Sequence, residues 1–191
     1  MSAALFQLGS LVDLVVYDKE NATLNRVKEV RSAFLYREIP FNMIKSAIAQ
    51  FIIEITRKSI REKEQNEPLF KFLYDRLTYL DKTNDQLTYF HLSFILQLPE
   101  YLGFSLQPTK LAQPYYLDIR EGTFLNSYKD VTYQLNDLQS FWVNQLLSDQ
   151  LPDIKSNQRK HLLEGILLYY KYHVDGFGEL NSHRIFEEIF N

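Results

Sequence analysis

The sequence contains no cysteine, and this absence excludes several kinds of chemistry at once. Without a thiol the chain forms no disulfide, no cysteine-ligated zinc site and no cysteine nucleophile. The absence also fits the reducing cytoplasm, which is the compartment that we predict. No apolar run approaches the roughly 20 residues of a membrane-spanning helix, and the first residues lack the pattern of a signal peptide. We therefore expect a cytoplasmic protein with no membrane partner.

Glycine and proline are also scarce, with six of each among 191 residues. A many-turned all-β protein needs more of both, so their scarcity favours long helices. So few glycines leave no phosphate-binding loop, no dinucleotide fingerprint and no nucleophile elbow, and none occurs. Aromatic residues, in contrast, are abundant at 15%. Composition thus predicts a mainly α protein and gives no support for a catalytic residue or a cofactor.

The four histidines stand apart, without the spacing that is typical of metal ligands: His91, His161, His173 and His183. We interpret them as ordinary core or surface residues and predict no metal site. The acidic pair Glu187 and Glu188 is expected on the exposed face of a terminal helix. An enzyme remains the least favoured alternative, since it requires His161, His173 and an acid to converge in a cleft.

Basic residues are concentrated in one stretch of the chain. Residues 26–63 carry nine basic and four acidic side chains, a net charge of +5, whereas residues 1–25 carry −2 and residues 64–191 carry −6. The overall charge of −3 does not suggest a chain-wide nucleic-acid binder. The distribution instead confines positive potential to the segment that follows the first predicted strand.

The first 36 residues are predicted to form a β-hairpin. Residues 10–18 are rich in Val and Leu, residues 21–23 provide a turn, and residues 24–34 form a polar, half-exposed strand. A two-stranded hairpin alone is marginally stable in water, so it must pack on something else. No later segment supplies further strands of the same sheet, which makes the hairpin incomplete as a domain.

From Ile39 onward the apolar residues recur with helical spacing, and residues 37–191 are predicted to form a helical domain. Pro40 suits the first helix start, and Asn66 suits an N-cap of the second. Gly103 fits the residue after a helix end, and Ser182 suits the cap of a last helix. Other helices are expected from about residue 84 to 102, over 137–148, and from 157 to 173. Near 115–125, Glu121 and Gly122 predict a small hairpin.

Two sets of basic residues are candidate DNA contacts. The strand set consists of Arg26, Lys28 and Arg31, and the helix set consists of Lys45, Arg57, Lys58 and Arg61, with Lys63 beyond it. Such residues follow a phosphate backbone without reading sequence. The alternative for the helix set is a solvated face stabilised by the Glu54–Lys58 spacing. Two sets within forty residues favour an electrostatic footprint.

The aromatic run Tyr169-Tyr170-Lys171-Tyr172, together with Phe177, has two interpretations. Aromatic rings can stack on bases or receive a peptide. The helical spacing favours the other interpretation, in which most of these rings belong to the core and tyrosine hydroxyls reach water.

Several stretches, in their order and spacing, resemble the RecO family of recombination mediators, most closely its Bacteroidetes-type members. They are ALFQ at 4–7, LVDLVVYDKE at 11–20, LNRVKEVRSAF at 24–34, IPF at 39–41, YLGF at 101–104, LDIREGTF at 117–124 and HVDGFGELNS at 173–182. The resemblance implies an N-terminal OB-fold barrel, of which residues 1–36 are a remnant, and a C-terminal helical domain. It also implies that the chain begins inside the barrel.

The resemblance further implies binding of single- and double-stranded DNA, of RecR, and of the C-terminal tail of single-stranded-DNA-binding protein, without catalysis. Many members hold zinc with four cysteines, which this chain lacks, so we expect the small hairpin to take over that structural role. We expect weak DNA binding by this chain, because most of the barrel is absent. The alternative function is a helical adaptor that binds proteins and not DNA.

Overall fold

A computed structural model describes residues 6–7, 9–17, 24–61, 65–130 and 132–182. A hairpin of β1 (Leu11–Tyr17) and β2 (Arg26–Phe34) precedes α1 (Met43–Ser59), α2 (Glu67–Lys82) and α3 (Leu87–Gln97). A 3₁₀ turn, η2 (Leu98–Tyr101), extends α3. The chain continues with β3 (Tyr116–Asp118), β4 (Thr123–Leu125), α4 (Asp137–Leu147) and α5 (Ser156–His173). The predicted mainly α fold with two small hairpins is confirmed.

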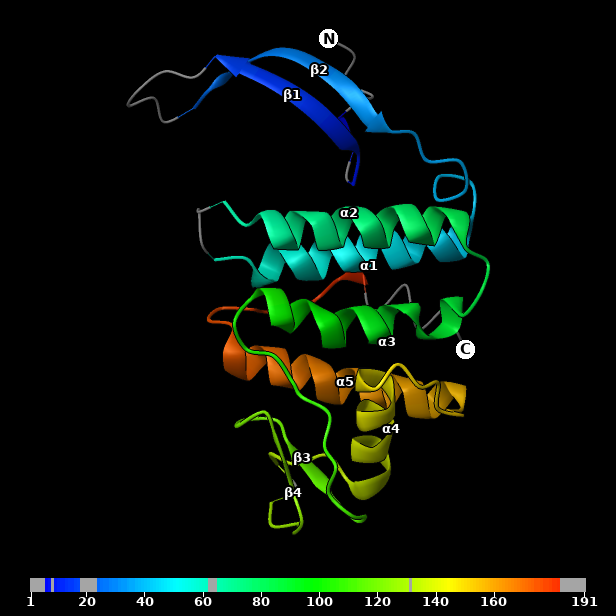
Figure 1. Ribbon diagram of the computed structural model, residues 1–191, viewed down its shortest axis with the longest axis vertical. Helices are drawn as coiled ribbons and strands as arrows, with labels where there is room; N and C mark the ends of the chain where they lie inside the picture. The colour runs from blue at the N-terminus through cyan, green and yellow to red at the C-terminus, as the bar shows by residue number, and fades with distance from the viewer. Residues whose placement is uncertain (1–5, 8, 18–23, 62–64, 131, 183–191) are drawn as a thin grey trace.

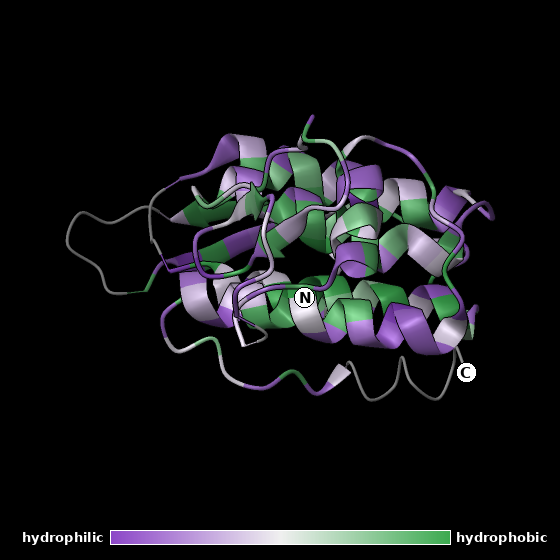
Figure 2. Cartoon of the chain, turned by 90° about the horizontal axis from the view of Figure 1, so that it is seen from below, coloured by the Kyte–Doolittle hydropathy of each residue, from purple (hydrophilic) through white to green (hydrophobic). Residues whose placement is uncertain are grey.

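The helices form a stack between the two hairpins. Figure 1 shows α1, α2, α3 and α5 lying roughly along one direction, with α4 crossing them. The β1–β2 hairpin arches over the α1–α2 end, and the β3–β4 hairpin lies at the opposite end. Figure 2 shows hydrophobic residues on the helix sides that face one another and hydrophilic residues outside. The helical residues therefore bury a common core, as the helical spacing of apolar residues requires.

The centre of this core lies where α1 meets α3 and α5. Ile48, Ile52 and Ile55 of α1 are completely buried, and each contributes about 1.5–3 kcal/mol relative to exposure. Tyr170 of α5 is equally buried, and its hydroxyl donates a 2.7 Å hydrogen bond to the carbonyl oxygen of Ile95 in α3. The hydroxyl thus has a partner inside the core, which removes the cost of burying it.

Asparagine caps begin three of the helices. Asn42, Asn66 and Asn136 each accept a hydrogen bond from the backbone N–H three residues later, at 3.1, 2.9 and 2.9 Å. The predicted cap at Asn66 is therefore confirmed. The first helix begins at Met43, later than Pro40 suggested, because residues 38–42 form a turn in which the N–H groups of Phe41 and Asn42 donate to the Glu38 carbonyl.

The long third helix predicted to 102 is instead α3 followed by η2. Pro99 has no N–H to continue the α-helical pattern, so the last turn tightens. Gly103 then adopts a φ of +84°, and the Phe104 N–H reaches back 3.2 Å to the Pro99 carbonyl. This is the left-handed helix end that was predicted from Gly103. The helix predicted after Ser182 lies outside the described residues.

The small hairpin predicted near 115–125 is confirmed as β3 paired with β4. Backbone hydrogen bonds also tie β3 to the segment before α4. The Ile119 N–H donates to the Tyr133 carbonyl at 2.8 Å, and the Leu135 N–H donates to the Leu117 carbonyl at 2.9 Å. The hairpin is therefore fixed to the helical body through main-chain contacts.

The β1–β2 hairpin joins the helices through a short linker that is tied to α2. The Asp81 carboxylate accepts hydrogen bonds from the backbone N–H groups of Arg37, Glu38 and Ile39, at 2.9–3.1 Å. The Tyr36 hydroxyl donates to the Gly9 carbonyl at 2.9 Å. These bonds orient the strands relative to the helices.

Candidate binding sites

The strand basic set is gathered on one face of the hairpin. The pairs Asp13–Arg31, Val15–Glu29 and Tyr17–Arg26 alternate with the apolar pairs Leu14–Val30 and Val16–Val27. A register shift between Val15 and Val16 leaves Lys28 as an extra residue, and its ammonium group lies 5.8 Å from the centre of the Tyr17 ring. Arg26, Lys28 and Arg31 are all exposed. The bulge thus adds Lys28 to the face that carries both arginines.

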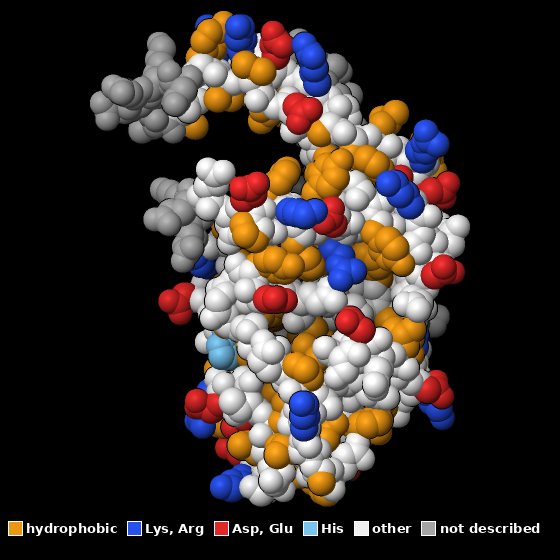
Figure 3. All heavy atoms as spheres, in the orientation of Figure 1, with side chains coloured by type: hydrophobic (Ala, Val, Ile, Leu, Met, Phe, Trp, Pro, Cys, Tyr) orange, Lys and Arg blue, Asp and Glu red, His pale blue; other side chains and the backbone are white. Residues whose placement is uncertain are grey.

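This basic face also contains two acids. Arg31 forms an ion pair with Glu29 at 3.4 Å, and Asp13 lies opposite Arg31 across the strands. Both partners of the ion pair are largely exposed, so it contributes little to stability. Figure 3 shows blue and red side chains interspersed on the arching hairpin. The face carries three bases against two acids, which is a weakly positive surface.

The helix basic set is divided by a segment that follows α5. Arg57 and Arg61 are exposed, whereas the Lys58 ammonium donates a 2.5 Å hydrogen bond to the Glu179 carbonyl. Glu54 on the same face accepts hydrogen bonds from the N–H groups of Asn181 and Ser182 and from the Ser182 hydroxyl. Residues 179–182 therefore pack against part of the predicted stripe. Lys63 lies outside the described residues.

The prediction that Lys45 contributes to a basic surface is wrong. Its side chain is completely buried, and its ammonium group donates a 3.0 Å hydrogen bond to the Asp81 carbonyl. Lys45 lies on the same face of α1 as Ile48, Ile52 and Ile55, which are also fully buried. The buried face of α1 includes this lysine because Asp81 supplies a partner for its charge.

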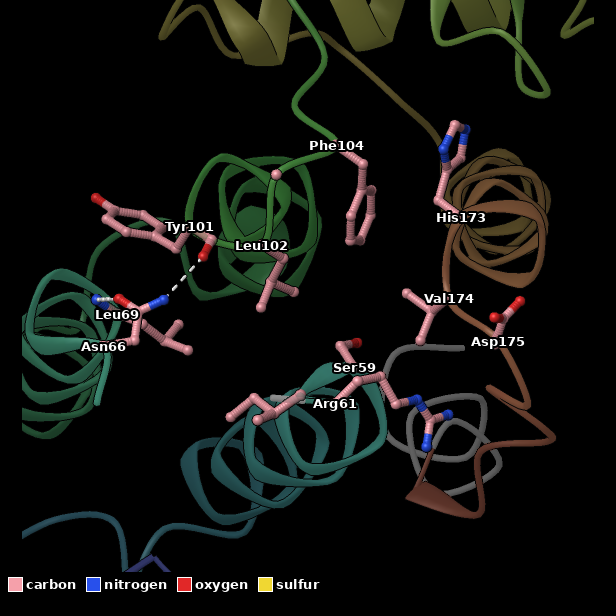
Figure 4. A pocket seen from close by; sticks show the side chains of 12 residues that line it. Ser59, Arg61, Asn66, Leu69, Tyr101, Leu102, Phe104, His173, Val174 and Asp175 are labelled. Carbon is pink, nitrogen blue, oxygen red and sulfur yellow. Dashed lines mark hydrogen bonds between the residues drawn. The ribbon is translucent and has the colours of Figure 1, made fainter. Parts of the chain in front are cut away.

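A pocket of about 430 Å³ opens between the end of α1, the start of α2, η2 and the end of α5. Figure 4 shows Leu69, Leu102, Phe104 and Val174 forming its apolar walls, with Arg61 and Asp175 at one side. The rings of Phe104 and His173 are stacked with centres 5.5 Å apart and planes 5° apart. The pocket therefore combines an apolar interior with one cationic and one anionic side chain at its edge.

Local contacts fix the walls of this pocket. The Asn66 side-chain amide caps α2 and also donates to the Tyr101 carbonyl at 3.1 Å, so it joins α2 to η2 (Figure 4). The His173 Nε2 lies 3.3 Å from the Ile119 carbonyl. Sequence reasoning did not predict this pocket. Two stretches of the lining, YLGF at 101–104 and HVD at 173–175, are among those that carry the family resemblance, but they are far apart in sequence and meet only in the fold.

The aromatic run of α5 is mostly core. Tyr169, Tyr170 and Phe177 are buried, and Tyr172 is 43% exposed. Burial raises the pKa of the Tyr169 hydroxyl above its ordinary value, and the hydroxyl donates to the Phe104 carbonyl. The prediction that these rings belong mainly to the core is confirmed.

Neither a metal cluster nor a membrane-spanning helix is found in the part of the chain that the structure describes. No three histidine or carboxylate side chains there converge as metal ligands. None of the described helices has the length and apolar character that crossing a bilayer requires. His183, Glu187 and Glu188 lie outside that part.

Comparison with known proteins connects this architecture to one class of repair proteins. The family model described as "Recombination protein O C terminal" matches residues 40–113, which extend from the linker through α3 to the segment before β3. The DNA repair protein RecO of Flavobacterium psychrophilum is 32% identical over 98% of this chain and 79% of its own length. RecO of Christiangramia forsetii is 33% identical over 98% and 80%, and that of Bacteroides fragilis is 29% identical over 100% and 81%.

These matches extend across the hairpin and all the helices, beyond the segment that the family model covers. The chain belongs to the RecO family of DNA repair proteins. Its role therefore lies in DNA repair and recombination. The resemblance that the sequence motifs indicated is confirmed.

Proposed function

We propose that this chain is a non-catalytic recombination mediator that binds DNA through the hairpin face containing Arg26, Lys28 and Arg31. The observation that carries the DNA contact is the placement of these three exposed side chains on one face, with the bulge adding the lysine. Guanidinium and ammonium groups on a strand face bind phosphates without reading bases. Arg57 and Arg61, the exposed members of the helix set, would extend the contact.

The test is fluorescence anisotropy with a labelled single strand and a labelled duplex at several salt concentrations. Replacing Arg26, Lys28 and Arg31 by Gln should weaken binding to both probes alike and reduce its salt dependence, because up to three phosphate contacts are lost. A control variant replaces Lys71, Lys110 and Arg120, which are also exposed, by Gln, so that the same charge is removed elsewhere on the surface. Equal losses in both variants would mean that only net charge matters, and would contradict the assignment to the hairpin.

A second proposed contact is the pocket between α1, η2 and α5, as a site for the C-terminal tail of single-stranded-DNA-binding protein. An acidic peptide that ends in Phe would place its ring among Leu69, Leu102 and Phe104 and its carboxylate near Arg61. The arginine provides a charge-assisted hydrogen bond, and the apolar walls bury the ring. Asp175 opposes such a peptide, which makes Arg61 the decisive charge.

This contact is tested by titrating the chain with a labelled acidic, Phe-ended peptide. Arg61→Gln should weaken binding several-fold, whereas Arg57→Gln should not, because Arg57 is exposed in the last turn of α1 and does not line the pocket. Peptide binding without any DNA binding would support the alternative function, a helical protein-binding adaptor. RecR is proposed as a further partner on the family relationship, and co-elution of the two proteins in gel filtration tests it.

A further inference from the structure

A second pocket, of about 410 Å³, lies between the C-terminal half of α2, the α3 helix and the end of α4. Phe90 and Leu146 are almost fully buried in it, and the half-exposed Tyr79 ring stacks on Phe90 with centres 6.1 Å apart. Gln86 and Gln150 add amide groups. The pocket thus combines an aromatic surface with hydrogen-bonding groups, on elements other than those of the proposed peptide site.

The charges of this pocket are unequal. Asp85 and Asp149 both line it, and within the described residues neither carboxylate takes part in an ion pair or a hydrogen bond. The one base in the lining, Arg76, is already engaged, since its guanidinium donates to the Gln97 side chain and lies over the Phe72 ring. The lining therefore carries two carboxylates and one guanidinium group, and the guanidinium is held by contacts to Gln97 and Phe72.

Asp149 occupies a position where its own helix disfavours it. The Gln150 N–H donates to the Gln145 carbonyl at 2.8 Å and the Asp149 N–H to the Leu146 carbonyl at 3.3 Å, which is the helix end that normally takes glycine. Asp149 has a φ of +54°, a left-handed conformation that costs a side-chain-bearing residue energy. Its negative charge also lies at the negative end of the α4 dipole.

We propose that this pocket binds an arginine side chain of a partner protein, with Asp149 and Asp85 as its anionic contacts. A guanidinium fits the lining because it can lie flat on Tyr79 while donating to carboxylate and amide oxygens. The negative end of the α4 dipole adds a favourable field for a cation. An aspartate stands at a helix end where a glycine would be more favourable, and such departures from local preference cluster at functional positions.

The proposal is tested with N-acetyl-L-arginine amide, and with the matched citrulline compound as its neutral isostere. Binding to the intact chain is followed by changes in the amide NMR signals of residues 85–86 and 148–151. Arginine should shift these signals in a saturable manner, and citrulline should bind at least about fivefold more weakly, because its charge-assisted hydrogen bonds are lost. Equal affinity for the two compounds would overturn the proposal.

Asp149→Gly separates a binding role from a structural one. It should raise the melting temperature by about 2–4 °C, since the left-handed strain is relieved, while weakening arginine binding about tenfold. Asp85→Asn should weaken binding in the same way, and Asp13→Asn on the hairpin should leave it unchanged. Unchanged affinity in both pocket variants, or a lower melting temperature in Asp149→Gly, would contradict the assignment. None of these measurements uses DNA or the Phe-ended peptide, so the outcome is independent of the proposed function.

Discussion

The ammonium group of Lys45 in α1 donates a 3.0 Å hydrogen bond to the backbone carbonyl of Asp81 at the end of α2. The Asp81 carboxylate is itself bonded to three N–H groups of the linker that follows β2. Burial alone would raise the pKa of Asp81, but these three N–H groups and the nearby Lys45 charge lower it below its ordinary value. One lysine, one aspartate and three backbone groups thus connect α1, α2 and the hairpin.

Replacing Lys45 should destabilise the protein because, unlike most lysines, it is completely buried. Lys45→Met keeps the volume but leaves the Asp81 carbonyl without its donor, and should lower the free energy of unfolding by about 1–3 kcal/mol. Urea unfolding measures this change. Lys71→Met, at an exposed ion pair on α2, should change stability by less than about 0.5 kcal/mol. An equal effect of the two substitutions would contradict a stabilising contribution from the buried Lys45 hydrogen bond.

His91 should make stability depend on pH in the mildly acidic range. Burial, followed by the nearby Arg159 charge, lowers the pKa of His91 from 6.5 to about 3. The unfolded chain therefore binds a proton below about pH 6.5 that the folded chain does not, and stability falls as the pH falls. The slope due to this group should approach about 1.4 kcal/mol per pH unit near pH 5. His91→Gln should lack this slope, and a ring that titrates near pH 6.5 in NMR would contradict the expectation.

Two carboxylates should add a second loss of stability at lower pH. Partial burial tends to raise the pKa of Glu54, but hydrogen bonds from Ser182 and Asn181 and the Lys58 charge lower it, as the linker contacts do for Asp81. Both groups stabilise the fold above their ordinary values of about 3.9–4.3, and this contribution is lost as the pH falls through their lower folded values. Urea midpoints between pH 5 and pH 2 measure the loss. The double variant Asp81→Asn/Glu54→Gln should be less stable at neutral pH and show a flatter acid limb.

Two glycines allow the cost of backbone strain to be separated from that of a steric clash. Gly9 and Gly103 both have a φ of +84°. A methyl group on Gly9 would lie 2.5 Å from the Ile53 Cδ1, whereas one on Gly103 would meet nothing within 4 Å. Gly103→Ala should therefore cost about 1–2 kcal/mol for the left-handed conformation, and Gly9→Ala should cost more. Urea unfolding of the two variants and the unsubstituted chain gives both free-energy changes. An equal change in the two variants would mean that the Ile53 side chain moves aside at no cost.

The helices and both hairpins could be predicted from the sequence because their signals are local. Asn66 precedes its helix by one residue, and Gly122 lies within its own turn. Lys45 shows where local reasoning ends. The apolar spacing of Ile48 and Ile55 located the buried face of α1. A lysine on that face is tolerated because the backbone carbonyl of Asp81, 36 residues later, accepts a hydrogen bond from its ammonium group.

The candidate sites depended on non-local contacts to different degrees. The members of the strand set could be predicted from the sequence, but their common face could not. Strict alternation would put Arg26 and Arg31, five residues apart, on opposite faces, and the bulge at Lys28 brings them onto one face. The interruption of the helix set could not, because the segment that contacts Lys58 follows it by 121 residues. The pocket at Arg61 was hidden for the same reason, since η2 and the end of α5 are brought together only by packing of the core.

The hydrogen bonds at Asp81 hold the hairpin at its linker end, so a small rotation there displaces the far end of the hairpin most. At about 3.4 Å per residue, Arg26 lies roughly 27 Å along β2 from Phe34, and Arg31 roughly 10 Å. A rotation of about 10° about the Phe34 end of β2 would therefore move Arg26 by about 5 Å and Arg31 by about 2 Å. The hydrogen bonds from the linker to the Asp81 carboxylate therefore restrict the orientation of the hairpin and, with it, the position of Arg26 at the far end.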